Sequence, residues 1–151
     1  MANSKQYRVR FGDVHDLPEV LQIERECFEE PWTEKLLRKY LRQREAIFRV
    51  VDLNGLLAGY VVYMVHPLGY IEISSLAVAE DSRRQGCGTI LMDFLKGYHI
   101  PIAFDVHESN LPGQLFFKAC GCRAVDVVDN FYDDGETAYL FRWNAEQTVT
   151  A

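Results

Sequence analysis

Apolar and polar residues follow two kinds of spacing at the start of this chain, and each spacing predicts one element. Residues 7–11 alternate between apolar and polar side chains, which is typical of a strand with one buried face. Residues 17–28 carry apolar side chains at helical intervals and predict a helix with one buried stripe. Asp16 and Glu19 have the spacing of a capping box, so we expect Asp16 to cap this helix.

The same signals predict the rest of the secondary structure. The expected elements are a helix capped by Thr33 over 34–42, strands over 48–53, 57–65 and 70–78, a helix over 89–96, a strand over 101–107, a helix over 114–120, and a hairpin of 123–130 with 136–143. This order predicts an α/β (α+β) protein. We expect one domain over 1–151, with its core at about 7–143 and a loose tail over 144–151.

The composition of the chain limits the classes of partner and binding site that we expect. The formal net charge is −6, whereas proteins that bind nucleic acid directly are usually basic. An acidic chain favours cationic partners such as amines or basic peptides. The four cysteines have no zinc-ligand spacing, so we expect no metal. No apolar run is long enough for a membrane helix and the first residues do not resemble a signal peptide, which favours a cytoplasmic protein that does not act on membranes.

The strongest chemical signal is a glycine-rich turn at residues 83–88, Arg-Arg-Gln-Gly-Cys-Gly, between a predicted strand and a predicted helix. The start of a helix presents backbone N–H groups without intrahelical partners at the positive end of the helix dipole. Gly86 and Gly88 allow an anion to approach the backbone, and Arg83 adds a positive charge. These features predict a diphosphate site. It is not a P-loop, because no Lys-Ser or Lys-Thr follows Gly88.

This turn and its setting resemble motif A of the GCN5-related N-acetyltransferases (GNAT), (Q/R)-x-x-G-x-(G/A), and the resemblance covers about residues 7–143. It implies a mixed, mostly antiparallel sheet of about six to seven strands flanked by about four helices. It also implies acetyl-coenzyme A as co-substrate, with its pantetheine arm along the strand at residues 73–78. The implied cofactor-binding residues are Leu76, Ala77, Val78, Arg83, Arg84, Gln85, Gly86, Cys87, Gly88, Thr89, Asn110 and Phe117.

Within this family, four segments resemble the RimI-type ribosomal-protein N-terminal acetyltransferases. They are Glu24-Arg25-Glu26-Cys27-Phe28 with Glu30-Pro31-Trp32-Thr33-Glu34-Lys35, Leu76-Ala77-Val78 with Arg83-Arg84-Gln85-Gly86, Asp105-Val106-His107-Glu108-Ser109-Asn110, and Asn130-Phe131-Tyr132. The resemblance implies a protein or peptide N-terminus as acceptor, for example that of a ribosomal protein. It assigns Glu30, Trp32 and Tyr132 to substrate binding, and we expect a monomer or weak dimer.

Two carboxylates are candidates for the base. An α-amino group has a pKa of about 8 and is partly neutral near pH 7, whereas lysine, near 10.4, is almost wholly charged. An enzyme that acetylates N-termini therefore needs only a weak base. The RimI pattern places a catalytic glutamate where this chain has Asp105, and Glu72 lies on the preceding strand. We expect both side chains to face one cleft, although each could instead be an ordinary exposed strand residue. Water could also serve.

The chain departs from the family at the residue that is proposed to protonate the leaving thiolate. RimI relatives carry a tyrosine twelve residues after the catalytic glutamate, and this chain has Phe117 there, which has no proton to donate. Two alternatives to N-terminal acetylation stay open, the first compatible with the acidic composition and the second with Phe117. The acceptor could be a small amine or polyamine, or the chain could be a weakly catalytic module that binds acyl-coenzyme A.

Overall fold

The structure is a computed structural model that describes residues 4–144. Its main elements are β1 (Tyr7–Phe11), α1 (Leu17–Cys27), α2 (Glu34–Leu41), β2 (Ile47–Leu53), β3 (Leu56–His66), β4 (Tyr70–Val78), α3 (Cys87–Lys96), β5 (Ile102–His107), α4 (Leu111–Ala119), β6 (Arg123–Val128) and β7 (Ala138–Trp143). Two short 3-10 helices cover Val14–Asp16 and Glu80–Ser82. None of the helices in the described part of the chain has the length and apolar character that crossing a membrane requires.

The seven strands form a sheet in the order β1-β2-β3-β4-β5-β7-β6. β4 and β5 run parallel, whereas β1 with β2, β2 with β3, β5 with β7 and β6 with β7 run antiparallel. This mostly antiparallel sheet with four α-helices confirms the predicted fold class and element order. The tail that we expected to be loose lies, after Asn144, outside the described residues.

The internal contacts of the chain divide it into two compact units. Within the described residues, the first comprises residues 4–64 together with Ile73–Phe94, and the second comprises Val65–Glu72 together with residues 95–144. The division therefore falls inside β3, β4 and α3. The domain boundaries expected from the sequence stay a prediction.

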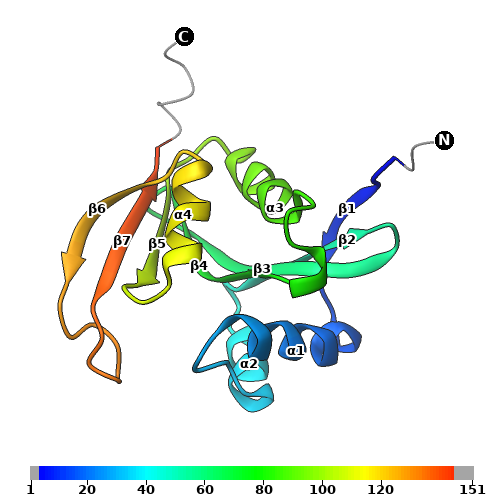
Figure 1. Cartoon of the computed structure of the whole chain (residues 1–151), viewed down its shortest axis with the longest axis horizontal. Helices are drawn as coiled ribbons and strands as arrows, with labels where there is room; N and C mark the ends of the chain where they lie inside the picture. Colours follow the sequence, from blue (N-terminus) through cyan, green and yellow to red (C-terminus); the bar gives the residue numbers. More distant parts are fainter. Residues whose placement is uncertain (1–3, 145–151) are drawn as a thin grey trace, which may run out of the picture. The chain divides into compact units, whose positions relative to one another are not determined.

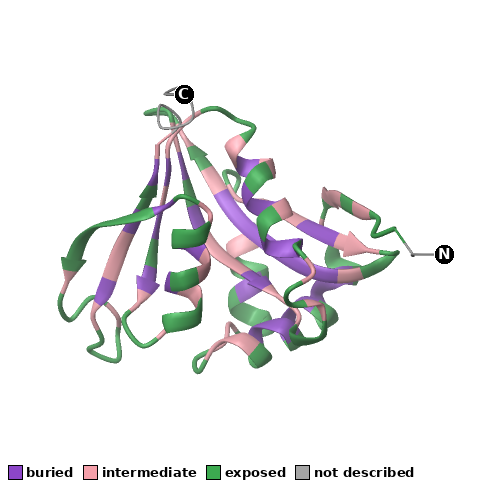
Figure 2. Cartoon of the chain, turned by 45° about the horizontal axis from the view of Figure 1, so that its top comes forward, coloured by how far each residue is buried: buried purple, intermediate pink, exposed green. Residues whose placement is uncertain are grey.

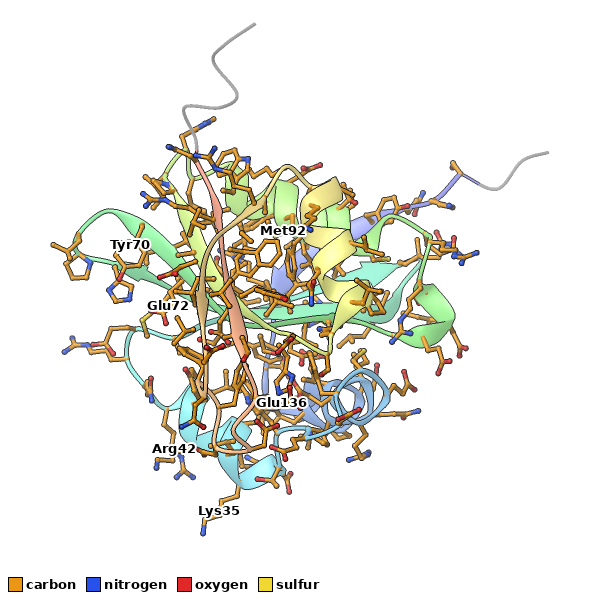
Figure 3. All side chains as sticks on the ribbon, turned by 60° about the vertical axis from the view of Figure 1, so that its left-hand side comes forward. Lys35, Arg42, Tyr70, Glu72, Met92 and Glu136 are labelled. Atoms are coloured by element: carbon orange, nitrogen blue, oxygen red, sulfur yellow. The ribbon has the colours of Figure 1, made fainter. Side chains whose placement is uncertain are left out.

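In the first unit, α1 and α2 cover one face of the β-strands and α3 covers the other (Figure 1). The buried stripe of α1 includes Leu17, Val20 and Ile23, as its helical spacing predicted. These side chains belong to one apolar core with residues of α2, β2 and β3. On the other face, Met92 of α3 is completely buried (Figure 3).

In the second unit, β5 pairs with β7 and β7 with the edge strand β6. Its interior holds the aromatic rings of Phe104, Phe117 and Phe141 from β5, α4 and β7. Figure 2 shows that the outward side of α4 is exposed, and Leu111 and Leu115 lie on that side, one turn apart. The turn between β6 and β7 carries Tyr132, and the other candidate residues of this unit lie on β4, β5 and α4 or at its N-cap.

The expected capping box at Asp16 is wrong. The box lies one turn earlier, because the chain enters α1 through a short 3-10 turn, and its N-cap is Asp13, which accepts a hydrogen bond from His15 N at 2.7 Å. Asp16 is instead the N3 residue of this box, and its side chain accepts from Asp13 N at 2.9 Å. Its carboxylate also forms an ion pair with Arg10 at 2.9 Å.

Helix α4 begins at Leu111, three residues before the predicted start at Gln114. Pro112 and Gly113 suggest a loop, but proline is well tolerated in the first turn of a helix, where its missing N–H would have no partner. Asn110 caps the helix by accepting a hydrogen bond from Gly113 N at 3.0 Å. Asn110 is therefore the N-cap of α4.

Candidate active site

The glycine-rich turn in the first unit has the backbone geometry of an anion site. Arg84 and Gly86 both have positive φ, at 61° and 85°. Ile90 N donates to Gly86 O at 2.9 Å, so the preceding N–H groups are those for which a helix offers no internal acceptor. Gly86 is exposed, as are the side chains of Arg83 and Arg84. A diphosphate fits this donor set, because backbone N–H groups, a helix dipole and two guanidinium groups all favour negative charge.

The turn is fixed from behind by β1 and α1. Tyr7 Oη of β1 donates a hydrogen bond to Gln85 O, and a Cβ atom at Gly86 would lie 3.2 Å from that hydroxyl. On the α1 side, Arg83 donates to Cys27 Sγ at 3.1 Å, and this thiol donates to Val78 O at 3.4 Å. Burial raises the pKa of the Cys27 thiol, which suits a protonated donor in this packing.

The predicted cofactor residues of the first unit form two stretches of chain, separated by Ala79 and the short 3-10 helix at Glu80–Ser82. They occupy the end of β4, the turn and the first turn of α3: Leu76, Ala77, Val78, Arg83, Arg84, Gln85, Gly86, Cys87, Gly88 and Thr89. Cys87 is buried, and burial raises its pKa. Its side chain is therefore part of the packing, and the contribution of this position to an anion would come from its backbone.

In the second unit, Tyr132 contacts one of the two predicted carboxylates. Its hydroxyl donates to Asp105 Oδ2 at 2.7 Å, which joins the β6–β7 turn to β5. Burial, together with this hydrogen bond to the carboxylate, raises the pKa of the phenol well above its usual value. Tyr132 is therefore a persistent hydrogen-bond donor and a poor acid. Asp105 is exposed, so its remaining lone pairs are accessible.

His107 contacts this pair, although the sequence analysis assigned it no role. Its ring stacks on Tyr132 with centroids 4.5 Å apart. Its Nδ1 lies 2.8 Å from Ser109 Oγ, and its Nε2 lies 3.2 Å from Asp134 Oδ2. A hydrogen bond from Glu136 N and then the contact with His107 lower the pKa of Asp134. The only sequence signal for His107 was its place two residues after Asp105, on the same face of β5.

Glu72 lies on the same face of the sheet as Asp105. It is paired with Ala103 in the parallel β4–β5 ladder, and Ala103 and Asp105 are two residues apart on one strand. The Glu72 carboxylate is half-exposed and lies 2.7 Å from His66 Nε2, and Figure 3 shows it beside Tyr70 on β4. A histidine partner that can receive a proton makes Glu72 a second candidate for the base.

Phe117 does not replace the missing acid. Its side chain is buried, with its ring centroid 4.2 Å from that of Phe104 and 6.4 Å from that of Phe141. It contributes to the core of the second unit and has no group that could protonate a thiolate. Within the described residues, no cluster of His, Cys, Asp and Glu side chains forms a metal site.

The predicted acceptor residues of the first unit lie between α1 and α2. Glu30 is exposed, whereas the Trp32 ring stacks on Tyr40 with centroids 4.9 Å apart. Trp32 N donates to Glu24 Oε2 at 3.0 Å. The sequence analysis gave Glu24 no role of its own, although it occupies a position on the apolar stripe of α1, seven residues after Leu17. The sequence signal that could have identified Glu24 was an acidic residue at a position where the helical spacing predicts a buried side chain.

Comparison with known proteins agrees with this geometry. The sequence pattern of the acetyltransferase (GNAT) family matches residues 17–122. The chain is 32% identical over 131 residues to an uncharacterized N-acetyltransferase of Methanocaldococcus jannaschii, covering 83% of each chain. It is 28% identical over 154 residues to an N-alpha-acetyltransferase of Sulfurisphaera tokodaii, covering 90% of this chain and 92% of the relative. The crystal structure of the ribosomal-protein-S18-alanine N-acetyltransferase from Escherichia coli has the same fold, with a TM-score of 0.79, 22% identity, and coverage of 93% and 94%.

Proposed function

Because the chain belongs to the acetyltransferase (GNAT) family, it is an acyltransferase with acetyl-coenzyme A as donor, and we propose that its acceptor is the N-terminal α-amino group of a protein. The relatives named as N-alpha-acetyltransferases support this acceptor, as does the fold shared with an enzyme that acetylates a ribosomal-protein alanine. We further propose that the protein acts in the cytoplasm as a monomer or weak dimer.

One contact carries the proposal: the 2.7 Å hydrogen bond from Tyr132 to Asp105. An acceptor amine must lose a proton as it becomes an amide, and Asp105 is an exposed carboxylate with free lone pairs. Tyr132 orients this carboxylate and places an aromatic lid from the β6–β7 turn over β5. Since an α-amino group with a pKa of about 8 is already partly neutral near pH 7, a carboxylate or a bound water is a sufficient base.

The reaction then needs few other groups. The neutral amine attacks the thioester carbonyl carbon, a C–N bond forms, and the C–S bond breaks. Asp105, directly or through water, takes the amine proton, and the coenzyme leaves as a thiolate that solvent protonates. A thiol with a pKa near 8.5 is a fair leaving group without a dedicated acid, which is compatible with the buried Phe117. The turn at Gly86 binds the diphosphate of the donor, and Leu76–Val78 bind its pantetheine arm.

The direct test is a set of acceptors measured by thiol release and mass spectrometry. We expect acetylation of peptides that begin with Ala, Ser or Thr. We expect no reaction of the same peptides with a blocked N-terminus and an internal lysine, or of spermidine. Turnover of spermidine in preference to every peptide would contradict the proposal.

A variant pair tests the base. Asp105→Asn keeps the size of the side chain and its bond to Tyr132 but removes the carboxylate, so we expect turnover to fall by about tenfold to a hundredfold with acetyl-coenzyme A affinity unchanged. Asp133→Asn, which removes an exposed charge from the same unit, is the control. Equal turnover in Asp105→Asn and the wild type would transfer the role to Glu72 or to water.

The buried Phe117 favours a second candidate, a module that binds acyl-coenzyme A without efficient transfer. It is distinguished by tight binding of acetyl-coenzyme A in calorimetry with no thiol release on any peptide or amine. Phe117→Tyr would not create activity in either case, because the side chain at this position lies among Phe104 and Phe141 rather than at the surface.

A further inference from the structure

Glu24 is a buried carboxylate in the first unit for which the proposed chemistry has no use. It is 2% exposed, and its three hydrogen-bond donors are all neutral groups. Its Oε1 accepts from Tyr60 Oη and, at 3.0 Å, from Ser75 Oγ. Its Oε2 accepts from Trp32 N at 3.0 Å. Removing a carboxylate from water without a counter-ion is costly, so a residue of this kind has a specific task.

The positions of the three donors indicate that task. Tyr60 lies on β3 and is completely buried. Ser75 lies on β4, directly before Leu76–Val78, the segment assigned to the pantetheine arm. Trp32 belongs to the segment between α1 and α2 that is assigned to the acceptor. A single side chain of α1 therefore joins the acceptor segment to the donor strand.

A second contact from the same helix reinforces this connection. Cys27, one turn after Glu24, donates to Val78 O at 3.4 Å, so α1 contacts β4 directly before Leu76, at Ser75, and at Val78. In the Trp32 segment, Glu24 accepts the hydrogen bond from Trp32 N, while the Trp32 ring stacks on Tyr40 of α2 and packs against the apolar core. Without the Glu24 carboxylate, this segment would lose its hydrogen-bonded link to Ser75 of β4.

We propose that Glu24 is a positioning residue for the acceptor: it fixes the Trp32 segment relative to the donor strand β4, and so sets the affinity for the peptide N-terminus. This inference rests on the proposed function, since it requires the Trp32 segment to contact the acceptor. Glu24 does not touch the reacting atoms. Loss of its carboxylate should therefore weaken binding of the acceptor and leave binding of the donor unchanged.

The experiment compares Glu24→Ala, Glu24→Gln and the control Glu19→Gln in the full chain. Glu24→Ala removes the acceptor oxygens, and we expect KM for an N-terminal Ala peptide to rise about tenfold while KM for acetyl-coenzyme A stays the same. Glu24→Gln restores much of the peptide affinity, because its Oε1 can accept from Trp32 N while its Nε2 donates to the Ser75 and Tyr60 hydroxyls. Glu19→Gln removes the same charge from an exposed position of α1 and has no effect.

A fluorescence measurement reports on the segment itself. The chain has two tryptophans, so Trp143→Phe leaves Trp32 as the sole reporter. We expect Glu24→Ala in this background to increase acrylamide quenching of Trp32, and Glu24→Gln to leave it close to the starting value. If Glu24→Ala does not fold, Glu24→Asp takes its place, because a carboxylate shorter by one methylene cannot reach all three donors and shifts both readouts in the same direction.

The outcomes separate the two proposals. An active wild type with unchanged peptide KM and unchanged quenching in the Glu24 variants would overturn the role of Glu24 alone. Equal losses of activity towards peptide and donor, in proportion to lost folded protein, would reduce Glu24 to a structural residue. A wild type that acetylates no peptide would contradict the proposed function and the acceptor role together, and the quenching would then show only whether Glu24 holds the segment.

Discussion

Two buried carboxylates of the first unit are stabilised by different chemistry. Asp16 accepts hydrogen bonds from the Arg10 guanidinium at 2.9 Å, and Arg10 also contacts Asp52 at 2.8 Å. The bond from Arg10 is the main cause that lowers the pKa of Asp16. Glu24 has only neutral donors around it. The first arrangement stabilises the fold through charge, whereas the second positions backbone segments.

The Asp16 contact predicts a pH-dependent stability. A carboxyl group with a lowered pKa stabilises the fold fully above its ordinary value of 3.8, and this stability is lost as the pH falls through the lower folded-state pKa. Asp16→Asn should therefore reduce the free energy of unfolding by about 1.5–3 kcal/mol at pH 7, and by less at pH 3. Urea denaturation at both pH values measures this, with the exposed Asp93→Asn as control. An equal deficit at the two pH values would contradict it.

At the scale of elements, the sequence predicted the order and most boundaries because local signals determine them. The Thr33 cap is one example: Thr33 Oγ1 accepts from Leu36 N at 3.1 Å, and α2 begins where expected. The predicted start of α4, at Gln114, was three residues late, because the helix includes Pro112 and Gly113 in its first turn. The capping box of α1 was misplaced because a 3-10 turn precedes the helix.

In the candidate site, too, part of the arrangement could be predicted from the sequence and part could not. The family resemblance assigned Asp105 and Tyr132 to one site, and the structure places a 2.7 Å hydrogen bond between them. No local pattern could supply the contact between Glu24 and Ser75, which are 51 residues apart. The stacking of His107 on Tyr132 likewise depends on the conformation of the β6–β7 turn.

Variants of Asn110 test whether the residue that caps α4 also has a second role in binding the donor. Asn110→Ala removes the cap of α4 and should lower stability by about 1 kcal/mol. Asn110→Asp keeps a good cap and should retain stability, but it loses the NH₂ donor and adds a negative charge. If Asn110 also contacts the donor, Asn110→Asp weakens acetyl-coenzyme A binding in calorimetry while its melting temperature is unchanged. Full affinity in Asn110→Asp would limit this residue to capping.

At the scale of the whole molecule, the net charge of −6 favours positively charged acceptors. We expect kcat/KM for a peptide with lysines after its N-terminal residue to fall several-fold between about 50 and about 500 mM salt, since screening shortens the range of this attraction. A peptide of the same length with neutral residues at those positions should change little. Equal salt dependence for both peptides would show that net charge does not guide the acceptor.

The account as a whole depends on the turn at Gly86, and two glycines of the first unit provide a matched test. Gly86 and Gly55 both have a φ of 85°, so a side chain imposes similar backbone strain at each. Gly55 lies in the β2–β3 turn with no atom within 4 Å of an added Cβ, whereas Gly86 opens α3 beside Tyr7. Aspartate at either position adds the same negative charge, but only at Gly86 would that charge meet the diphosphate that we propose binds there.

Calorimetric titration of acetyl-coenzyme A into the wild type, Gly55→Asp and Gly86→Asp is therefore the most direct measurement. We predict equal dissociation constants for the wild type and Gly55→Asp, and affinity at least about tenfold weaker, or no detectable heat, for Gly86→Asp. Binding by Gly86→Asp as tight as that of the wild type, or a wild type that releases no heat with acetyl-coenzyme A, would contradict the central claim.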